Sequence, residues 1–474
     1  MAWSISVAKR ATSGHLTGPP SMKYQHNKDN NQVKNMRNAE YSAAPGVVVK
    51  AAETAVKGRW FTLAMLTAVY LMSVADRNIF AILLPHIKAE MSLSDTQLGL
   101  LSGVAFGIFY GALGIPIAYL ADRYNRRNII TGSLAIFSVM TVVCGMAGNF
   151  VQMLFARMGV GVGEAGTSPP SHAMLADYFP PERRTMAMGV LTMGGFIGML
   201  VGFVAGGMVA DAYGWRAAFY TLGLPGLLLS ILLWLTVKEP QRGLTEGKAA
   251  SENTAHIGFG EAFGLLWRQK TYRHCLAIFC LSSFMCYGMF VWIPTYLVRI
   301  FGMDTREIGV MFGLVVSLAG IAGALSSGWV VDALAKRDQR WGLWVLAVMS
   351  IAVTPFMLFG FTTESSMLAI LSFAAPSYLM AFITPAIIVL AQRLAPLRAR
   401  SMASAVLFFS SSLLGIGFGP LFVGFASDQF TGWFGDESLR YSLLALIPLA
   451  ILVAGHCYFG SKSLSADISR VQEI

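Results

Sequence analysis

Long apolar stretches alternate with short polar ones along the chain from about residue 60 onward. An α-helix needs about 20 apolar residues to cross a bilayer. Twelve stretches have about this length, and they predict twelve spanning helices at approximately 61–84, 97–121, 129–148, 150–176, 185–210, 217–237, 275–298, 308–331, 341–361, 365–391, 401–427 and 441–460. The expected fold class is therefore an all-α integral membrane protein.

Polar segments divide the predicted spans into two groups of six. The segment 238–274 is predicted to be a cytoplasmic linker between an N-terminal six-helix bundle at 60–237 and a C-terminal six-helix bundle at 275–460. Residues 1–59 form a polar N-terminal tail that lacks the apolar core of a signal peptide, and we expect this tail to be disordered. A short C-terminal tail follows at 461–474.

The two predicted bundles repeat short motifs in the same order. SDTQLGLLSG opens the second span and MDTREIGVMFG opens the eighth, so that Gly99 and Gly309 are 210 positions apart. Patterns that begin at Ser94 and Asp304 are typical of a helix start. A second pair of motifs, AYLADRYNRR and GWVVDALAKR, closes the same two spans. These matches indicate two pseudo-symmetric halves.

Composition and charge fit a membrane protein. The chain is 55% hydrophobic and 13% charged, against about 25% charged residues in soluble domains. Its formal net charge of +10 is spread over the tail and short loops, which argues against a nucleic-acid partner. If the N-terminus is inside, the loops on that side carry eleven Lys and Arg residues against five outside. The positive-inside rule then predicts a multi-pass protein of the inner (plasma) membrane with both termini in the cytoplasm.

Four charged residues lie inside the predicted spans, Asp76 and Arg77 in the first and Arg157 and Glu164 in the fourth. An ionised group at the bilayer centre costs about 2.5–3.5 kcal/mol on insertion scales, so such groups pair or face water. At 1.5 Å per residue, Asp76 and Glu164 lie about 22 and 18 Å from the inner ends of their helices, near the midplane. Asp76 and Arg77 diverge by about 100°, so we expect only one of them to point into a central cavity.

Two motifs give the chain a family resemblance. GIPIAYLADRYNRR resembles the G-x-x-x-D-R-x-G-R-R loop of the major facilitator superfamily, although Ala118 and Asn125 replace two of its glycines. The Asp-Arg pair of the first span, together with RMGVGVGEAGTSPPSHAMLADYFPPERR at 157–184, is similar to segments of spinster-family transporters. The resemblance implies two six-helix halves around a midplane site and transport by alternating access.

A proton-coupled site is the function predicted for the four intramembrane charges. A carboxyl group whose arginine partner is close in one conformation and distant in another can bind and release a proton. We predict Asp76 and Glu164 as proton-coupling residues, with Arg77 and Arg157 as their partners or as anchors for an anionic substrate group. The alternative is a static ion pair that only holds the first and fourth helices together. The candidates for that pair are Asp76–Arg157 and Arg77–Glu164.

The loop between the second and third spans contains the other charged candidates. The resemblance implies a cytoplasmic gate made of Asp122, Arg123, Arg126 and Arg127. The simpler alternative is that its arginines only fix the topology of the chain.

The C-terminal half has no charged residue in its predicted spans. Its candidate substrate contacts are aromatic, with Tyr287 in the seventh span and Tyr378 in the tenth, although packing is the simpler role for each. One charged half and one aromatic half suggest an amphipathic substrate. Spinster proteins of eukaryotes carry sphingosine phosphates and lysophospholipids, which fits this expectation by resemblance.

The predicted function is therefore a secondary active transporter of an amphipathic small molecule, lysolipid-like or sphingolipid-like, coupled to protons. The alternative is an exporter or importer of another small organic solute without proton coupling. Motifs of hydrolases, zinc proteases and P-loop enzymes are missing from the sequence, so it does not indicate a membrane enzyme. A channel would not need the two-half repeat. We expect no cofactor, no metal and a monomer in the lipid bilayer.

Overall fold

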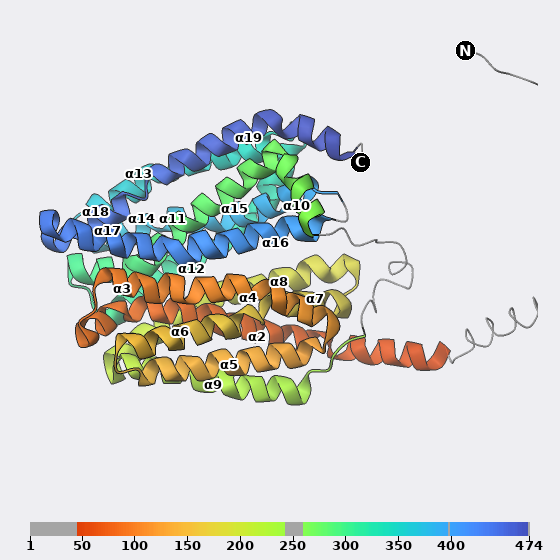
Figure 1. Ribbon diagram of the computed structural model, residues 1–474, viewed down its shortest axis with the longest axis horizontal. Helices are drawn as coiled ribbons and strands as arrows, with labels where there is room; N and C mark the ends of the chain where they lie inside the picture. The colour runs from red at the N-terminus through yellow and green to blue at the C-terminus, as the bar shows by residue number, and fades with distance from the viewer. Residues whose placement is uncertain (1–44, 242–258, 397–398, 473–474) are drawn as a thin grey trace, which may run out of the picture. The chain divides into compact units, whose positions relative to one another are not determined.

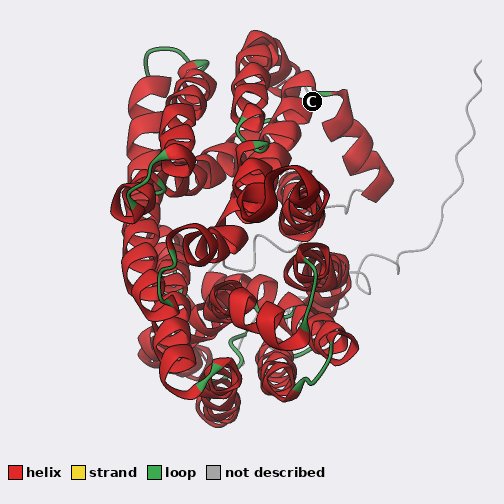
Figure 2. Ribbon diagram, turned by 90° about the vertical axis from the view of Figure 1, so that its left-hand side faces the viewer, coloured by secondary structure: helices red, strands yellow, loops and turns green. Residues whose placement is uncertain are grey.

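The computed structural model describes residues 45–241, 259–396 and 399–472. The chain divides into two units, Met1–Ala55 and Val56–Ile474. Every regular element in the described ranges is a helix (Figure 2). Of the first unit, the described part is the beginning of one helix, so the fold below is that of the second unit.

The N-terminal half is built from the first helices of the chain. Their bounds are α2 (Pro45–Met91), α3 (Asp95–Gly99), the π-helical turn η1 (Leu100–Val104), α4 (Ala105–Arg123), α5 (Arg126–Met146), α6 (Phe150–Ala165), α7 (Ser168–Tyr178), α8 (Pro181–Tyr213) and α9 (Trp215–Thr236). Helix α5 packs against α6 and α9, and α4 packs against α6. These contacts make one bundle, in which α6 lies against both α4 and α5.

The C-terminal half contains the remaining helices. Their bounds are α10 (Phe259–Arg268), α11 (Lys270–Phe301), α12 (Thr305–Ala335), α13 (Trp341–Thr362), α14 (Ser366–Ser372), α15 (Ala374–Arg393), α16 (Arg400–Ser410), the π-helical turn η4 (Ser411–Phe418), α17 (Gly419–Phe434), the 3₁₀ turn η5 (Gly435–Glu437), α18 (Ser438–Leu444) and α19 (Pro448–Gln472). Helix α19 packs against α11 and α13, and α12 packs against α15. Figure 1 shows α5 and α9 in one group and α13 and α19 in the other.

The all-helical membrane fold predicted from the sequence is confirmed. Ten helices of the described ranges are long and apolar enough to cross a membrane. One of these, Met402–Val471, runs over two predicted spans, because α16 to α19 follow one another with only short breaks. The predicted fourth span is divided between α6, with 16 residues, and α7, with 11 residues. The helices therefore follow the twelve apolar stretches of the sequence.

The two repeated glycines lie where the halves meet. A side chain on Gly99 of α3 would collide with the backbone of Pro420 in α17. A side chain on Gly309 of α12 would collide with the backbone oxygen of Phe203 in α8. Glycine permits this close approach of two backbones because it has no Cβ. The sequence repeat thus corresponds to two equivalent contacts between the halves, α3 with α17 and α8 with α12.

The predicted helix starts are at the expected positions. Ser94 caps α3, with its side chain accepting from the backbone of Gln97 and the Gln97 side chain accepting in return. Asp304 stands at the N-cap position of α12, but its side chain makes no capping hydrogen bond. The capping box is therefore complete in the first half only.

The polar segments at both ends are more helical than we predicted. Residues 45–59 of the predicted disordered tail belong to α2, where proline in the first turn and Ala, Glu and Lys after it favour a helix. The rest of that tail lies outside the described residues. At the other end, α19 runs through the predicted C-terminal tail to Gln472. Asp467 explains this extension, because it accepts a 2.7 Å hydrogen bond from the backbone N–H of Thr271.

The predicted linker 238–274 contains ordered helix as well. Helix α10 lies within it, and α11 begins at Lys270, five residues before the predicted span. Leu266 of α10 is fully buried whereas Trp267 beside it is exposed. Such a two-faced helix can lie along a surface without crossing the membrane, and for this reason a search for long apolar stretches does not find it. Residues 242–258 lie outside the described ranges.

Candidate functional site

The four predicted intramembrane charges meet as two ion pairs between α2 and α6. Arg77 Nη2 lies 2.7 Å from Glu164 Oε2. Arg157 Nη1 lies 2.9 Å from Asp76 Oδ2. The two pairs that the sequence offered as alternatives are therefore both present in one structure.

Asp76 is fully buried, and both of its oxygens have partners. Thr141 of α5 donates a 2.5 Å hydrogen bond to Oδ1, and Arg157 donates to Oδ2. The guanidinium of Arg157 also lies 4.3 Å from the ring centre of Phe80 and 5.3 Å from that of Phe106. This pair joins α2 to α5 and α6, so Asp76 is the member of the adjacent pair that braces neighbouring helices.

Glu164 is equally buried, but only one of its oxygens is satisfied. Oε2 accepts from Ser73 at 2.6 Å and from Arg77 Nε at 2.8 Å. Oε1 has no hydrogen-bond partner among the described residues. Nearly all buried polar atoms of native proteins are bonded, so an exception needs a reason such as a bound water or a protonation site. Glu164 Oε1 is an atom that could take a proton without losing an existing partner.

Arg77 is the member of the adjacent pair that faces a cavity. Its side chain is 18% exposed, against 0% for Glu164. The cavity has a volume of about 30 Å³ and lies between the halves, lined among others by Arg77, Phe80 and Arg157 from one half and by Tyr287, Val291 and Ile416 from the other. That volume holds only a few water molecules. A larger solute therefore needs this cavity to widen.

The two predicted tyrosines have different surroundings. Tyr287 of α11 lines the cavity together with Arg77. Tyr378 of α15 lies inside the C-terminal half, where its hydroxyl is 2.6 Å from Ser326 Oγ of α12 and its ring stacks on Phe382. The structure thus brings Tyr287 to the charged residues, whereas Tyr378 makes packing contacts.

The arginines of the loop between α4 and α5 bind partners within their own half. Arg126 is buried, with Nη1 2.6 Å from Asp177 Oδ2 of α7 and Nε 2.8 Å from Glu239 Oε1 after α9. The backbone N–H of Arg127 donates to Glu239 Oε2 at 2.9 Å. These bonds hold the ends of α5, α7 and α9 together at this end of the N-terminal half.

Arg123, by contrast, is exposed, and its guanidinium lies 4.2 Å from the ring centre of Tyr119. The side chain of Asp122 lies outside the described part of the structure. A gating contact of this loop with the other half therefore stays a prediction.

Several partners of these charges were missed by the sequence reasoning. Ser73 and Thr141 are single hydroxyls in apolar spans, although Ser73 stands four residues before Arg77, which places both on one helix face. Asp177 lies in the LADYF segment that contributed to the family resemblance, and Glu239 stands two residues after the sixth span. Acidic residues at span ends could have been paired with the loop arginines on this basis.

The described residues contain no group of three or more His, Cys, Asp or Glu side chains arranged to hold a metal ion. The chemistry available at the central site is that of two carboxylates, two guanidiniums and a tyrosine. Its four charges sum to zero, so any proton or ion that enters changes the net charge of a small, largely apolar space.

Comparisons with known proteins agree with this architecture. The sequence profile of the Major Facilitator Superfamily matches residues 66–420. The chain is 33% identical over 402 residues to an MFS-type efflux pump of Mycolicibacterium smegmatis, covering 84% of this chain and 92% of that protein. It is 26% identical to the hexuronate transporter of Bacillus subtilis, covering 80% and 90%. A crystal structure of a bacterial homologue of the human lysosomal transporter Spinster, inward-facing and unoccupied, superposes with a TM-score of 0.77 at 27% identity, covering 86% and 98%.

Proposed function

This chain belongs to the Major Facilitator Superfamily, and we propose that it is a spinster-type transporter that carries an amphipathic small molecule together with protons. Proteins of this superfamily are secondary transporters of small molecules and not enzymes. The finer proposal concerns the coupling ion, the substrate class and the orientation in the membrane.

Glu164 carries the proposal for proton coupling. Its Oε1 is buried and lacks a hydrogen-bond partner in the described structure, while its other oxygen holds the cavity-facing Arg77. Protonation of Glu164 would remove the negative charge that balances Arg77. Since an unpaired charge is costly in a dry site, Arg77 would then favour an anionic group of the substrate. Protonation of Glu164 would in this way create the anion-binding site at Arg77.

Asp76 and Arg157 form the second half of the proposed coupling site. Asp76 has no free oxygen, so it requires a larger rearrangement than Glu164 before it can take a proton. Arg157 also lines the cavity, and its Nε lacks a partner within the described residues. We assign Arg157 as a second contact for an anionic head group.

The cavity walls support an amphipathic substrate. Arg77 and Arg157 lie on one side, whereas Val291 and Ile416 are apolar and come from the opposite half. Tyr287 contributes a hydroxyl group next to the charges. A polar head at the arginines and an apolar tail along the opposite wall describe a lysolipid-like or sphingolipid-like molecule, in line with the family resemblance of the sequence.

The proposed orientation follows the positive-inside rule. Both termini are then in the cytoplasm, the protein lies in the inner (plasma) membrane as a monomer, and α3 begins at the outer surface. The loop with Asp122, Arg123, Arg126 and Arg127 lies at the inner surface under this proposal. Its gating role is supported by the family resemblance, and Arg126 would keep this end of the N-terminal half together as it moves.

Transport measurements in proteoliposomes test this function. Labelled lysolipids, sphingoid bases, sugars and organic anions are offered with and without a pH gradient. We expect a lysolipid or sphingoid base to accumulate only with the gradient, and Glu164→Gln to abolish that accumulation. Arg268→Gln is the control, since this exposed residue of α10 belongs neither to the cavity lining nor to the proposed gate.

A different small solute is the second candidate function. It is favoured by the likeness to the efflux pump and to the hexuronate transporter. Accumulation or efflux of a sugar acid or another organic anion at equal rates with and without the pH gradient would contradict the proposal and support this candidate.

A further inference from the structure

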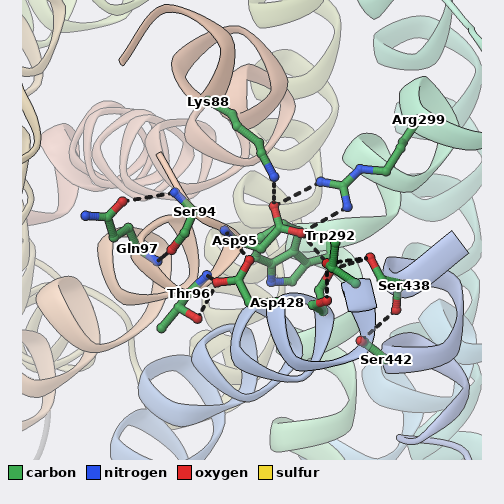
Figure 3. Close-up of polar contacts among 12 residues, drawn as sticks. Lys88, Ser94, Asp95, Thr96, Gln97, Trp292, Arg299, Asp428, Ser438 and Ser442 are labelled. Carbon is green, nitrogen blue, oxygen red and sulfur yellow. Dashed lines mark hydrogen bonds and ion pairs between the residues drawn. The ribbon is translucent and has the colours of Figure 1, made fainter. Parts of the chain in front are cut away.

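A second charged network joins the two halves at the end where α3 begins (Figure 3). Asp95, the first residue of α3, has a side chain that is only 2% exposed. Lys88 of α2 binds its Oδ1. Arg299 of α11 donates to both of its oxygens at 2.9 Å. Ser427 of α17 donates to Oδ2 at 2.6 Å. One buried carboxylate of the N-terminal half is thus bound by its own half and by the opposite half.

A second carboxylate makes the reciprocal contact. Asp428 of α17 accepts from the backbone N–H of Asp95 at 3.0 Å and from that of Thr96 at 2.7 Å. The hydroxyl of Thr96 donates to the same carboxylate at 2.5 Å. Each half therefore contributes a carboxylate that is bonded by the other half, and both sets of bonds lie at the start of α3.

We propose that Lys88, Asp95, Arg299 and Asp428 form a latch that holds this end closed and divides into two neutral pairs when the halves separate. Lys88 and Asp95 both belong to the N-terminal half, so their ion pair can survive the separation. Arg299 and Asp428 both belong to the C-terminal half and both bind Asp95 in the closed form. They are therefore neighbours that can pair once Asp95 has left.

This division of charge makes the latch reversible. Breaking a buried ion pair is costly mainly because it leaves one charge without a partner. Here neither half retains a net charge after separation. The start of α3 also keeps its capping hydrogen bond in the open form, because the backbone N–H of Gln97 donates to Ser94 of the same half at 3.2 Å. The closed form can thus be strongly bonded without making the open form prohibitive.

The inference rests on the proposed alternation of access, under which this end is the outer one. It needs neither the proposed substrate nor proton coupling. Its test is accordingly a distance measurement that involves no solute. Failure of the transport assay would leave this measurement unaffected.

Distances between spin labels at this end of the two halves test the latch. Tyr213→Cys at the end of α8 and Trp433→Cys at the end of α17 are suitable positions, since both residues are largely exposed, at 80% and 77%. The five native cysteines are buried and will label little. The pair is measured by pulsed electron resonance in lipid nanodiscs, and the ratio of long to short distances gives the open to closed ratio.

Variants on the two sides of the latch are expected to act in opposite directions. Arg299→Gln removes two charged hydrogen bonds to a buried carboxylate from the closed form, whereas its pair with Asp428 in the open form is solvated and contributes less. We therefore expect the open to closed ratio to rise about tenfold. Asp428→Asn should raise the ratio as well, because it weakens three hydrogen bonds from the start of α3 in the closed form and removes only a solvated pair from the open form. Lys88→Gln, measured in the Asp428→Asn background where both forms are populated, should lower the ratio about threefold. The reason is that Lys88 is one of several partners of Asp95 when closed, but its partner of the same half when open.

The control and the refuting results are defined by the same measurement. Arg216→Gln breaks a pair with Glu90 inside the N-terminal half, and it should leave the ratio unchanged. A shift of the same sign in Lys88→Gln and Arg299→Gln would mean that the cluster is only structural. An unchanged ratio in Asp428→Asn would also overturn the proposal. If Arg299→Gln does not fold, Asp428→Asn and Lys88→Gln still decide the question.

Discussion

Replacing Arg157 by methionine should strongly destabilise the N-terminal half, because Asp76 would then be buried without its counter-ion. Arg157 is 1% exposed and Asp76 is 0% exposed. Breaking a buried pair by removing one partner costs about 3–5 kcal/mol, although Thr141 still donates to Asp76. At roughly 2 °C per kcal/mol for a folded part the size of the N-terminal half, the melting temperature of this half should fall by about 6–10 °C.

The double variant separates a true ion pair from simple loss of packing. Adding Asp76→Asn to Arg157→Met removes the stranded charge, and replacement of both members of a buried pair is often close to neutral. We therefore expect the double variant to regain about half of the lost stability or more. In a double-mutant cycle this appears as a coupling free energy of about 2–3 kcal/mol.

A thiol-reactive fluorophore gives the melting curves. All five cysteines, Cys144, Cys275, Cys280, Cys286 and Cys457, are buried and free, so they react only when the purified protein unfolds. The matched cycle uses Arg77→Gln and Glu164→Gln, where we expect a smaller coupling because Arg77 is partly exposed to the cavity. Two results would refute this assignment of a structural pair and a proton-coupling pair. One is that the stability losses of the Arg157 and Asp76 variants are additive, and the other is that the coupling free energy is larger for Arg77 and Glu164.

Three further predictions concern transport, the inner loop and the contact between the halves. In proteoliposomes, Glu164→Gln should reduce gradient-driven accumulation of substrate more than tenfold, and Asp76→Asn should reduce it less. Full accumulation in both variants would refute the assignment of these residues to proton coupling. Asp177→Asn should lower the melting temperature by a few degrees, because buried Arg126 loses a 2.6 Å ion pair, whereas exposed Arg123→Gln should not; equal shifts would contradict the assignment. Gly103→Val should increase the distance between the spin labels at positions 213 and 433, because a side chain at Gly103 meets the backbone of Gly417 in the other half. Gly132→Val should leave this distance unchanged, because a side chain there meets open space.

The sequence predicted the spans well because the membrane itself sets their length. All twelve apolar stretches correspond to helices, and the two repeated glycines lie at equivalent contacts between the halves. What apolar length could not reveal were the helices outside the expected spans, α10 and the end of α19. Their stability depends on tertiary contacts such as Asp467 with Thr271.

The candidate site was predicted in its charges but not in its connections. Asp76, Arg77, Arg157 and Glu164 are conspicuous because charges are rare in apolar spans. Which carboxylate pairs with which arginine depends on the rotation of α2 against α6, and this rotation has no signature in a single sequence. Hydroxyl partners such as Thr141 cannot be recognised from the sequence either, since serine and threonine are common in such helices.

The latch could not be predicted from the sequence, for a different reason. Lys88 and Arg299 counted as ordinary charges of the outer loops, which are expected to be solvated. Asp428 stands one residue beyond the predicted eleventh span. Only the approach of α3 to α17 turns these surface charges into a buried network around Asp95.

The two charged networks respond differently to separation of the halves. All four central charges belong to α2 and α6 of one half, so a rocking movement carries them as a unit and breaks neither pair. The movement instead shifts the opposite wall of the cavity, which is formed by Tyr287 and apolar side chains of the other half. The latch, in contrast, is divided between the halves and senses the movement directly. Under the proposed function, proton and substrate binding would act on the movement through the cavity around Arg77. They would do so by changing the net charge that the opposite wall covers when the halves come together.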